Sequence, residues 1–523
     1  MATTSYDPLH PPRKALSGSD PSSFGYTTIQ SRLPVIVSKT VDDIYRTYHS
    51  LPDTDPHKGA KEQEAKSIIE AIGALRYELQ RDKPFRPLKD NLPDVEEWNQ
   101  ALAEYYATSS WFKASWLFAE CYLYRRIKET FALTSHWRDY DPFFEQKQTV
   151  FRSSQKAVVA IAARLMSPSN NSNSDTGDKE QAKSLSALDV LVSQGPDSKG
   201  TREAFLELSQ VCLWGNATDL SLLDNPDLAK VEELQRRMLG NSSPSPGSQS
   251  HSQASSKNSS SLDLDKQVQE EANVQQPRQE GETSELEKHA EKILQNDTEL
   301  LWEKVKNMRN GRVDFILDNA GFELYVDLVF ADFLVRAGFA STVVFHSKRI
   351  PWFVSDVMPF DFQWALDQLH KAGTSDPFFN PEDPTEQQAL KDLGQKWQSY
   401  VDQGVWKVTS HNFWTSCYAF YHLPTHPSAQ DLFDDMKQSD LWIFKGDLNY
   451  RKLVYDCQWP TTTPFQEAIG PLGSREDVPS LVSFRTCKAD VVVGLKPGVG
   501  EKMDTIDKNW MVNGEYAVIS FKP

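Results

Sequence analysis

The sequence predicts an α/β protein: an all-α N-terminal domain, then a C-terminal domain with a largely parallel sheet covered by helices on both faces. Apolar residues recur at helical spacing in the first half, whereas short β-branched runs alternate with helical stretches after Gly311. A polar, serine-rich segment separates the two patterns. The 523 residues are enough for this division, since a domain holds roughly 150 residues.

The composition indicates a folded protein and argues against several partners. Hydrophobic residues make up 39% of the chain and aromatic residues 11%, which is ample for sizeable cores. The formal charge of −17 argues against nucleic acid and anionic membranes, because both attract basic surfaces. No apolar run approaches the roughly 20 residues of a membrane span. Five scattered cysteines favour a reducing compartment, cytoplasmic or nuclear.

The N-terminal half is predicted in three parts. Residues 1–26 are rich in proline and serine and are expected to form a disordered tail. Residues 27–240 are predicted to form the all-helical domain, in which Trp98 and Leu102 illustrate the helical spacing. Within this domain the polar stretch 167–182 is expected to be a surface loop.

Residues 241–283 are predicted to be a disordered linker, because 11 serines within 21 residues cannot bury enough apolar surface to offset chain entropy. Residues 284–523 are then predicted to form the α/β domain. Ser284 and Glu287 fit a capping box at the start of a helix whose apolar stripe reaches Leu294.

Five β-branched runs of this domain are predicted as strands. They are VDFIL, STVVFH, DLWIFK, ADVVVGL and YAVISF, which begin at positions 313, 341, 440, 489 and 516. Ligands of open α/β sheets bind beyond the carboxyl ends of the strands. Polar residues that follow the strands are therefore candidates for a functional site.

Several polar residues are expected to meet at that end of the sheet. Asp318 and Asn319 follow the first predicted strand, and Asp356 follows the second after a short segment. Arg451 comes shortly after the third strand, and Lys488 lies in SFRTCK. Each has a simpler explanation when taken singly, as a helix cap or a solvated surface charge. Their convergence favours a site.

The chemistry of this set points to phosphoryl transfer. Asp318, Asn319 and Asp356 offer hard oxygen donors, which suit Mg²⁺ or Mn²⁺ better than zinc and leave positions for water and substrate. The metal polarises a phosphoryl oxygen, while Arg451 and Lys488 hold the developing charge. Water can attack phosphorus directly, or Asp318 can attack first while Asp356 orients the water.

The sequence also resembles a known family. LDNAGFEL, PWFVSDV, KGDLNYRKL and FRTCK, in this order, are similar to motifs of the metal-dependent damage-control phosphatases. The string Arg485-Thr486-Cys487-Lys488 resembles the Arg-Thr-x-Lys motif of the subfamily that acts on sugar phosphates. WLFAECYLYRRI and LWGNATDLSLL are also similar to that subfamily. The resemblance spans residues 27–523 apart from the polar inserts.

The resemblance implies a fold and a metal site. The fold is a three-layer α/β/α sandwich C-terminal domain with an all-α N-terminal domain, and the active site faces the interface. Asp318, Asn319 and Asp356 would hold Mn²⁺ or Mg²⁺, with Asp318 and Asp356 as the catalytic residues.

The resemblance also implies a substrate. The expected substrates are fructose 1-phosphate, fructose 6-phosphate and related reactive phosphometabolites, which the enzyme would remove in a damage-control role. The implied substrate-binding residues are Asp318, Asn319, Asp447, Leu448, Asn449, Tyr450, Arg451 and Lys488.

Two alternatives to hydrolysis remain open. The resemblance also implies S-adenosylmethionine-dependent methylation of protein glutamates, with Glu323 and Asp356 binding that cofactor. The sequence favours hydrolysis, because Pro497 interrupts VVVGLKPGVG, the only Gly-rich candidate for an adenosyl-binding turn. The other alternative, a catalytically inactive interaction protein, is disfavoured because every motif residue is present.

Overall fold

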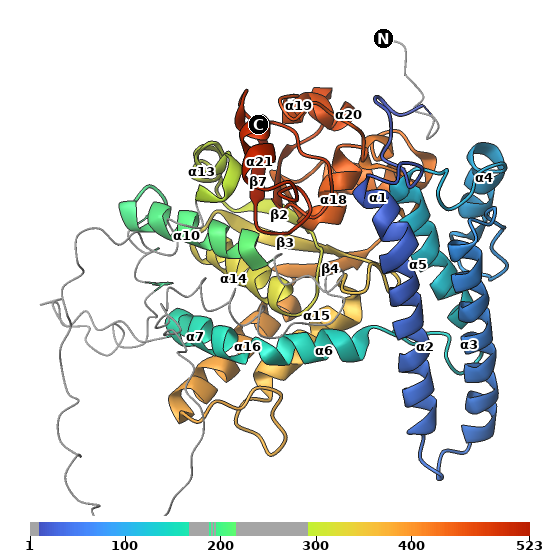
Figure 1. The fold of residues 1–523 in the computed structure, drawn as a ribbon. Helices are drawn as coiled ribbons and strands as arrows, with labels where there is room; N and C mark the ends of the chain where they lie inside the picture. The colour runs from blue at the N-terminus through green and yellow to red at the C-terminus, as the bar shows by residue number, and fades with distance from the viewer. Residues whose placement is uncertain (1–9, 167–187, 190–191, 193–194, 216–290) are drawn as a thin grey trace, which may run out of the picture.

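A seven-stranded sheet organises the protein, here described by a computed structural model over residues 10–166, 188–189, 192, 195–215 and 291–523 (Figure 1). The strand order is β1-β7-β6-β5-β2-β3-β4. Strands β2 to β6 run parallel, β7 is antiparallel to β6, and β1 is parallel to β7. The predicted α/β class with a largely parallel sheet is confirmed.

The strands are β1 Ile293–Asn296, β2 Gly311–Ile316, β3 Ala340–Ser347, β4 Trp406–Ser410, β5 Leu441–Lys445, β6 Ser480–Thr486 and β7 Ala517–Lys522. Four of the five predicted strands are confirmed as β2, β3, β5 and β7. They are rich in β-branched and aromatic residues and buried along most of their length, as expected for a sheet covered on both faces.

The predicted strand at 489–495 is wrong, because this run forms no strand. The Arg485 guanidinium donates to the carbonyl of Ala489 over 3.0 Å and also to that of Val491. These bonds from one buried side chain satisfy carbonyls that a strand would pair with a neighbour. The three valines of this run are nevertheless buried, so its apolar character indicated burial and not strand structure.

The predicted helix that reaches Leu294 is also wrong over its last residues. Ile293 and Leu294 lie in β1, whose parallel pairing with β7 outweighs their helical spacing. The capping box at Ser284 and Glu287 lies outside the described residues, as do the polar loop 167–182 and the linker 241–283.

The helices of the N-terminal half are α1 Phe24–Thr27, α2 Leu33–His49, α3 Lys58–Gln80, α4 Val95–Tyr105, α5 Trp116–Ala132, α6 Phe144–Ser153, α7 Gln155–Met166 and α10 Lys199–Gly215. A π-helical turn, η1 Thr28–Arg32, joins α1 to α2. The helices of the C-terminal half are α13 Thr298–Val305, α14 Phe322–Arg336, α15 Pro359–His370, α16 Pro384–Asp402, α17 Gln430–Met436, α18 Gly446–Leu453, α19 Phe465–Ala468, α20 Pro471–Ser474 and α21 Val499–Ile506. Within the described residues, no helix is both long and apolar enough to cross a membrane.

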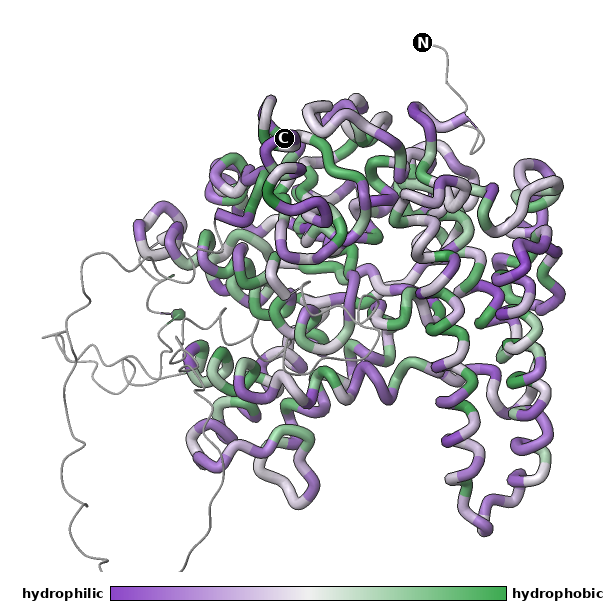
Figure 2. The backbone as a smooth tube through the Cα atoms, viewed as in Figure 1, coloured by the Kyte–Doolittle hydropathy of each residue, from purple (hydrophilic) through white to green (hydrophobic). Residues whose placement is uncertain are grey.

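Helices cover both faces of the sheet, which gives the predicted three layers (Figure 1). Val313 and Phe315 of β2 share one core with α7, α10, α14 and α16, while Ile316 belongs to a second core with α17 and α18. Helices α1 to α5 extend this second core on the side away from the sheet. Figure 2 shows hydrophobic residues concentrated in the centre, whereas the free end of the α2–α3 hairpin is largely hydrophilic.

The helices predicted within 27–240 do not pack as one unit. Helix α7 packs against α16, and α10 packs against α14, so both cover the sheet face opposite α1 to α5. Tyr325 of α14 donates a hydrogen bond to the carbonyl of Val158 in α7 over 2.9 Å. Helical periodicity identifies the helices but not which layer each joins, because packing partners lie far away in the sequence.

Residues 10–26, predicted as part of the disordered tail, are packed against the body. The Leu16 N–H donates to the Asp456 carbonyl over 2.9 Å, and the Leu16 carbonyl accepts from the Trp116 N–H over 2.8 Å. The Leu16 side chain is buried. One apolar anchor and two backbone bonds outweigh the loose composition of this segment, and residues 1–9 lie outside the described chain.

A buried arginine fixes the helical layer beside the sheet. Arg125 of α5 is fully buried, and its guanidinium donates four hydrogen bonds of 2.8–3.0 Å to Asp90 and Asp94. We expect Arg125→Leu to lower the free energy of unfolding by about 3–5 kcal/mol, because two carboxylates would remain buried without their cation. Thermal and denaturant unfolding followed by circular dichroism measure this change.

The matched control is Arg76→Leu on the exposed face of α3, where a change within about 0.5 kcal/mol is expected. Equal destabilisation by the two variants would contradict a special role for the Arg125 network.

Candidate active site

The site lies where the order of the strands reverses. Strands β3 and β4 extend the sheet on one side of β2, and β5 and β6 extend it on the other. In open α/β sheets, the crevice outside such a switch point accepts ligands. Asp318 follows β2 and Gly446 begins α18 directly after β5, so both lie at this crevice.

Backbone pairing brings the two predicted catalytic carboxylates together. Asn319 and Asp356 form an isolated antiparallel bridge outside the sheet. The Val357 N–H donates to the Asp318 carbonyl over 2.8 Å. The loops after β2 and β3 are thus joined side by side, and Asp318 and Asp356 line the same cavity.

The loop that carries Asp356 is strained and is held from two sides. Phe353 and Val354 have φ angles of 44° and 70°, a region that a β-branched residue rarely adopts. Lys348 Nζ lies 3.1 Å from Asp356 Oδ2, and Lys147 Nζ of α6 donates to the Asp356 carbonyl over 3.0 Å. Strain of this kind persists at functional sites when surrounding contacts maintain it.

The Asp318 carboxylate lies against Gly446. This glycine has a φ of +82°, and a Cβ placed on it would lie 1.8 Å from Asp318 Oδ2. Only glycine fits this position, because any side chain would displace the carboxylate. The carboxylate therefore sits at the N-terminal end of α18, where the helix dipole favours negative charge.

The Asn319 side chain orients the Asp318 carboxylate. Its Nδ2 donates to Asp318 Oδ2 over 2.9 Å and to Glu323 Oε2 over 2.7 Å. Its Oδ1 accepts a hydrogen bond from Ser355. Asn319 is not among the residues that line the cavity, and its predicted role as a metal ligand stays a prediction.

Glu323 lies behind the site, in the core of α14. It is fully buried, and its Oε1 lies 3.1 Å from Lys445 Nζ, which also bonds Asp327 over 2.6 Å. Its other oxygen accepts from Asn319. Glu323 therefore holds the loop of Asn319 against α14 and is not among the residues that line the cavity.

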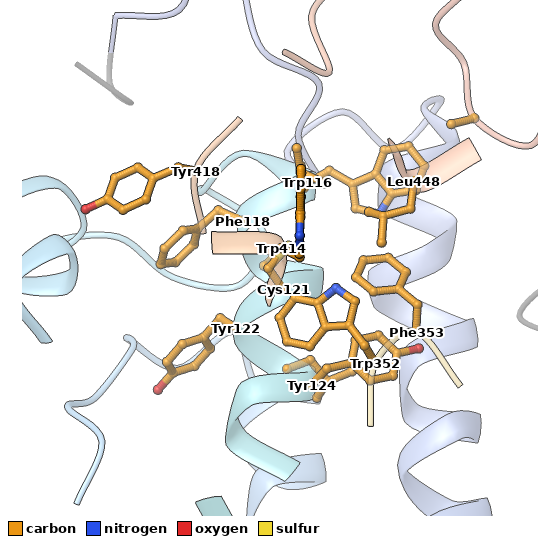
Figure 3. Close-up of a cluster of buried hydrophobic side chains, with 14 of the residues drawn as sticks. Trp116, Phe118, Cys121, Tyr122, Tyr124, Trp352, Phe353, Trp414, Tyr418 and Leu448 are labelled. Atoms are coloured by element: carbon orange, nitrogen blue, oxygen red, sulfur yellow. The ribbon is translucent and has the colours of Figure 1, made fainter. Parts of the chain in front are cut away.

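A cavity of about 530 Å³, counting its opening to solvent, lies over the two aspartates. One wall comes from the strand ends and α18, and the other comes from η1, α2 and α5. Figure 3 shows aromatic and aliphatic side chains of this region, including Trp116, Tyr124, Phe353 and Leu448, gathered between α5 and the loops of the sheet. The lining residues are Thr28, Arg32, Leu33, Ile36, Trp116, Glu120, Tyr124, Asp318, Phe353, Asp356, Asp447, Leu448, Arg451 and Lys488.

The predicted substrate-binding residues of α18 divide between cavity and core. Asp447, Leu448 and Arg451 line the cavity, whereas Asn449 and Tyr450 do not. Helical spacing explains the division: with a rotation of about 100° per residue, Asp447, Leu448 and Arg451 share one face of α18, and the other two residues lie on the remaining faces.

Asn449 and Tyr450 instead hold the frame of the site. The Asn449 amide donates to the carbonyls of Ile316, Leu317 and Lys445 over 2.8–3.2 Å, which fastens the end of β2 to α18. The Tyr450 hydroxyl accepts from the Val493 N–H over 3.0 Å.

Arg451 reaches across to the helical layer. Its Nη1 donates to Glu120 Oε2 over 2.7 Å, and its Nε and Nη2 donate to Asp456 over 2.9 Å each. Its guanidinium stacks 3.8 Å from the ring centre of Trp116. Burial lowers the pKa of Arg451, but Asp456 and Glu120 outweigh it and raise this pKa above its usual value. The guanidinium is thus a permanent, oriented charge.

The Arg-Thr-x-Lys string is clamped by Asp447. Asp447 Oδ1 accepts from Arg485 Nε over 2.7 Å and from the Lys488 N–H over 3.1 Å. Arg485 also stacks 4.2 Å from the ring centre of Tyr450. Arg485 therefore shapes the loop, and Lys488 is the cation of this string that lines the cavity.

The helical layer contributes a wall of the cavity that was not predicted from the sequence. Arg32, Trp116 and Glu120 line the cavity opposite the strand ends. A signal existed for Glu120, because a carboxylate within the apolar run WLFAECYLYRRI must find a partner if the helix is buried. Nothing in the local sequence marks Arg32.

Asp318 and Asp356 fit a hard divalent cation. Both are oxygen donors on one cavity, and Mg²⁺ or Mn²⁺ retains several positions for water and substrate oxygens. In the part of the chain that the structure describes, no three His, Cys, Asp or Glu side chains form a metal-binding group. A cation here would therefore need oxygen ligands besides these two carboxylates, from an amide such as that of Asn319 or from water and substrate.

Comparisons with known proteins agree with these motifs. Residues 28–262 and 261–503 match the model of the damage-control phosphatase ARMT1-like domain. The protein named damage-control phosphatase ARMT1 from Xenopus tropicalis is 35% identical over 525 residues, which cover 97% of this chain and 98% of the relative. The relatives of the same name from Danio rerio and Homo sapiens are 34% and 31% identical, over 98% and 97% of this chain and 97% and 98% of their own. The chain belongs to the damage-control phosphatase ARMT1-like family.

Proposed function

We propose that this protein is a metal-dependent phosphatase that hydrolyses sugar phosphates, such as fructose 1-phosphate and fructose 6-phosphate, in a damage-control role. One observation carries the proposal: Asp318, Asp356, Arg451 and Lys488, from four separate segments, line one cavity at the switch point of the sheet. Carboxylates for a cation beside cations for a phosphate complement a phosphate ester. The names of the relatives support the same reaction class.

The charge of the cavity supports a requirement for a metal. Four carboxylates and three cationic side chains line it, counting only described residues. A dianionic phosphate ester would meet excess negative charge there. A bound Mn²⁺ or Mg²⁺ would reverse that balance and polarise the phosphoryl group. Asp318 and Asp356 would hold it, with Asn319 orienting Asp318.

The other residues bind the ester and move the proton. Lys488 holds a phosphoryl oxygen as a point charge, and Arg451 presents a fixed guanidinium nearby. Water attacks phosphorus while Asp356 accepts its proton, the bond from phosphorus to the sugar oxygen breaks, and Asp356 returns the proton to that oxygen. Direct attack is simpler than attack by Asp318, since a carboxylate engaged with a metal is a poor nucleophile.

No observation favours methyl transfer as a second function. Glu323, which would contribute to S-adenosylmethionine binding, lies off the cavity, and its oxygens bond Lys445 and Asn319. Moving it into contact with a cofactor would leave the buried Lys445 with one carboxylate fewer.

We expect Asp318→Ala to abolish Mn²⁺-dependent phosphate release from fructose 1-phosphate. The loss should exceed the roughly 100-fold that removal of an outer partner of a metal ligand costs. Asp376→Ala, at an exposed aspartate of the same half of the chain, is the control and should keep wild-type rates. Normal turnover by Asp318→Ala, or by wild-type protein in excess chelator, would sink the proposal.

We expect Mn²⁺ to stabilise the chelator-treated wild type against thermal unfolding. Binding at 100 times the Kd corresponds to about 2.7 kcal/mol, which is readily measured as a rise in Tm. The Asp318→Ala variant should show little or no rise. An equal rise in both proteins would place the cation elsewhere.

We expect Gly446→Ala to lose phosphatase activity while remaining folded, because its Cβ must displace the Asp318 carboxylate. Gly338→Ala is the matched control: Gly338 also has a positive φ, of +72°, but no atom lies within 4 Å of its Cβ position. Both variants should lose about 1–2 kcal/mol of stability from the backbone conformation. Only Gly446→Ala should lose activity, and equal activities would contradict the steric argument.

A further inference from the structure

We propose that the cavity wall formed by Arg32, Trp116 and Glu120, here called the helical wall, binds the hydroxyl-bearing sugar part of the substrate. This inference rests on the proposed phosphatase function and assigns substrate choice to the helical layer. The strand ends supply the aspartates and Lys488, which act on the phosphate. The helical wall faces them across the same cavity and supplies contacts for the rest of the molecule.

Aromatic rings hold the arginines of this region in place. The Arg32 guanidinium lies 5.2 Å from the ring centre of Phe24, and Phe24 meets Trp116 edge-on at 5.7 Å. Trp116 in turn carries the Arg451 guanidinium at 3.8 Å. Cation–π contacts of this kind fix a guanidinium plane and direct its N–H groups along the edge. The edge of Arg451 donates to Glu120 and Asp456, so Arg32 is the guanidinium that we assign to the ligand.

Arg32 occupies an unusual backbone position. It is the last residue of the π-helical turn η1, and such turns are rare and frequent at functional sites. Helix α1, which leads directly into this turn, is anchored near the phosphate side of the site. Its Phe24 N–H donates over 3.4 Å to Oδ2 of Asp490, which lies two residues after Lys488 in the sequence. The position of Arg32 is thereby tied to the loop that carries Lys488.

The charge of the helical wall suits a neutral polyol better than a second phosphate. Burial raises the pKa of Glu120, and the charges of Arg451 and Arg32 oppose this rise, so Arg32 lies within electrostatic range of the carboxylate. Asp456 is the further anion bound to Arg451. The positive charges of Arg32 and of the neighbouring Arg451 nearly cancel the negative charges of Glu120 and Asp456, so a dianion would gain little electrostatic energy by binding here.

The helical wall offers the donors and acceptor that a sugar needs. Hydroxyl groups both donate and accept, and Arg32 can donate while Glu120 can accept. The Trp116 indole N–H is a donor that is 1% exposed and has no hydrogen-bond partner among the described residues. Other buried tryptophans share this property, Trp111 among them, but Trp116 is the tryptophan that lines the cavity. A hydrogen bond to a substrate hydroxyl oxygen would satisfy this buried N–H group and stabilise the complex.

Apolar side chains also line the cavity. Tyr124, Phe353 and Leu448, whose side chains are drawn in Figure 3, are among its lining residues and can contact the C–H faces of a sugar.

The test compares two phosphate esters that share the phosphate but differ in the leaving group. Steady-state kinetics with Mn²⁺ are measured for fructose 1-phosphate and p-nitrophenyl phosphate, using wild type, Arg32→Gln and Trp116→Phe. We expect each variant to lose about tenfold in kcat/KM for fructose 1-phosphate, the effect of one hydrogen bond, mainly through KM. The value for p-nitrophenyl phosphate should change less than about twofold. Trp116→Phe keeps a ring beneath Arg451 and removes the N–H.

Matched controls exclude general damage. Arg46→Gln changes an exposed arginine of α2 outside the cavity, and Trp111→Phe removes another buried indole N–H that has no hydrogen-bond partner in the described part of the chain. Both should behave as wild type with both esters. Arg32→Lys keeps the charge without the planar fork and should show an intermediate loss with fructose 1-phosphate. The Tm of every variant is measured alongside.

The outcomes separate the two proposals. Equal losses with both esters, or no loss with fructose 1-phosphate, would overturn the sugar-binding role of the helical wall and leave the phosphatase proposal standing. A wild type that releases phosphate from neither ester would overturn the phosphatase proposal, and the helical wall with it.

Discussion

The contact between the Asp318 carboxylate and Gly446 is the constraint on which the rest of the site depends. It requires β2 and β5 to be neighbours, because the aspartate follows one strand and the glycine follows the other. Asn449 holds these strand ends together through three backbone carbonyls. The bridge at Asn319 then brings in the Asp356 loop, and Asp447 brings in Lys488. Each functional group is thus placed relative to one carboxylate.

The helical layer is a structural part of the site and not a separate module beside it. The Arg451–Glu120 ion pair crosses between the layers in a buried environment, where loss of either partner would leave a charge without compensation. Trp116 reinforces the pair by stacking on the guanidinium. This arrangement encloses the cavity between the two layers. Under the proposed function, the helical layer contacts the sugar and the sheet edge contacts the phosphate.

The sequence allowed prediction where the determinants are local. Asp318 follows the end of β2 closely and Asp356 follows β3 after a short segment, so their place at the sheet edge could be inferred from their order along the chain. Arg32 could not, because its place on the cavity depends on a fold that brings η1 over the ends of distant strands. The run 489–495 has strand propensity, yet hydrogen bonds from Arg485 determine its backbone. The buried Leu16 shows that the composition of a polar segment does not reveal whether one of its residues anchors it to the core.

The backbone hydrogen bonds of Leu16 have a consequence for how the protein folds during synthesis. The same segment makes a second contact with the C-terminal half, where Cys457 Sγ donates to the Arg13 carbonyl across 444 sequence positions. Contacts of such separation form late, because the entropy of closing the long loop must be offset by structure already in place. A nascent chain on the ribosome would therefore hold residues 13–16 without these partners until Asp456 and Cys457 have been synthesised. Docking of this early segment is in this way coupled to synthesis of the C-terminal half.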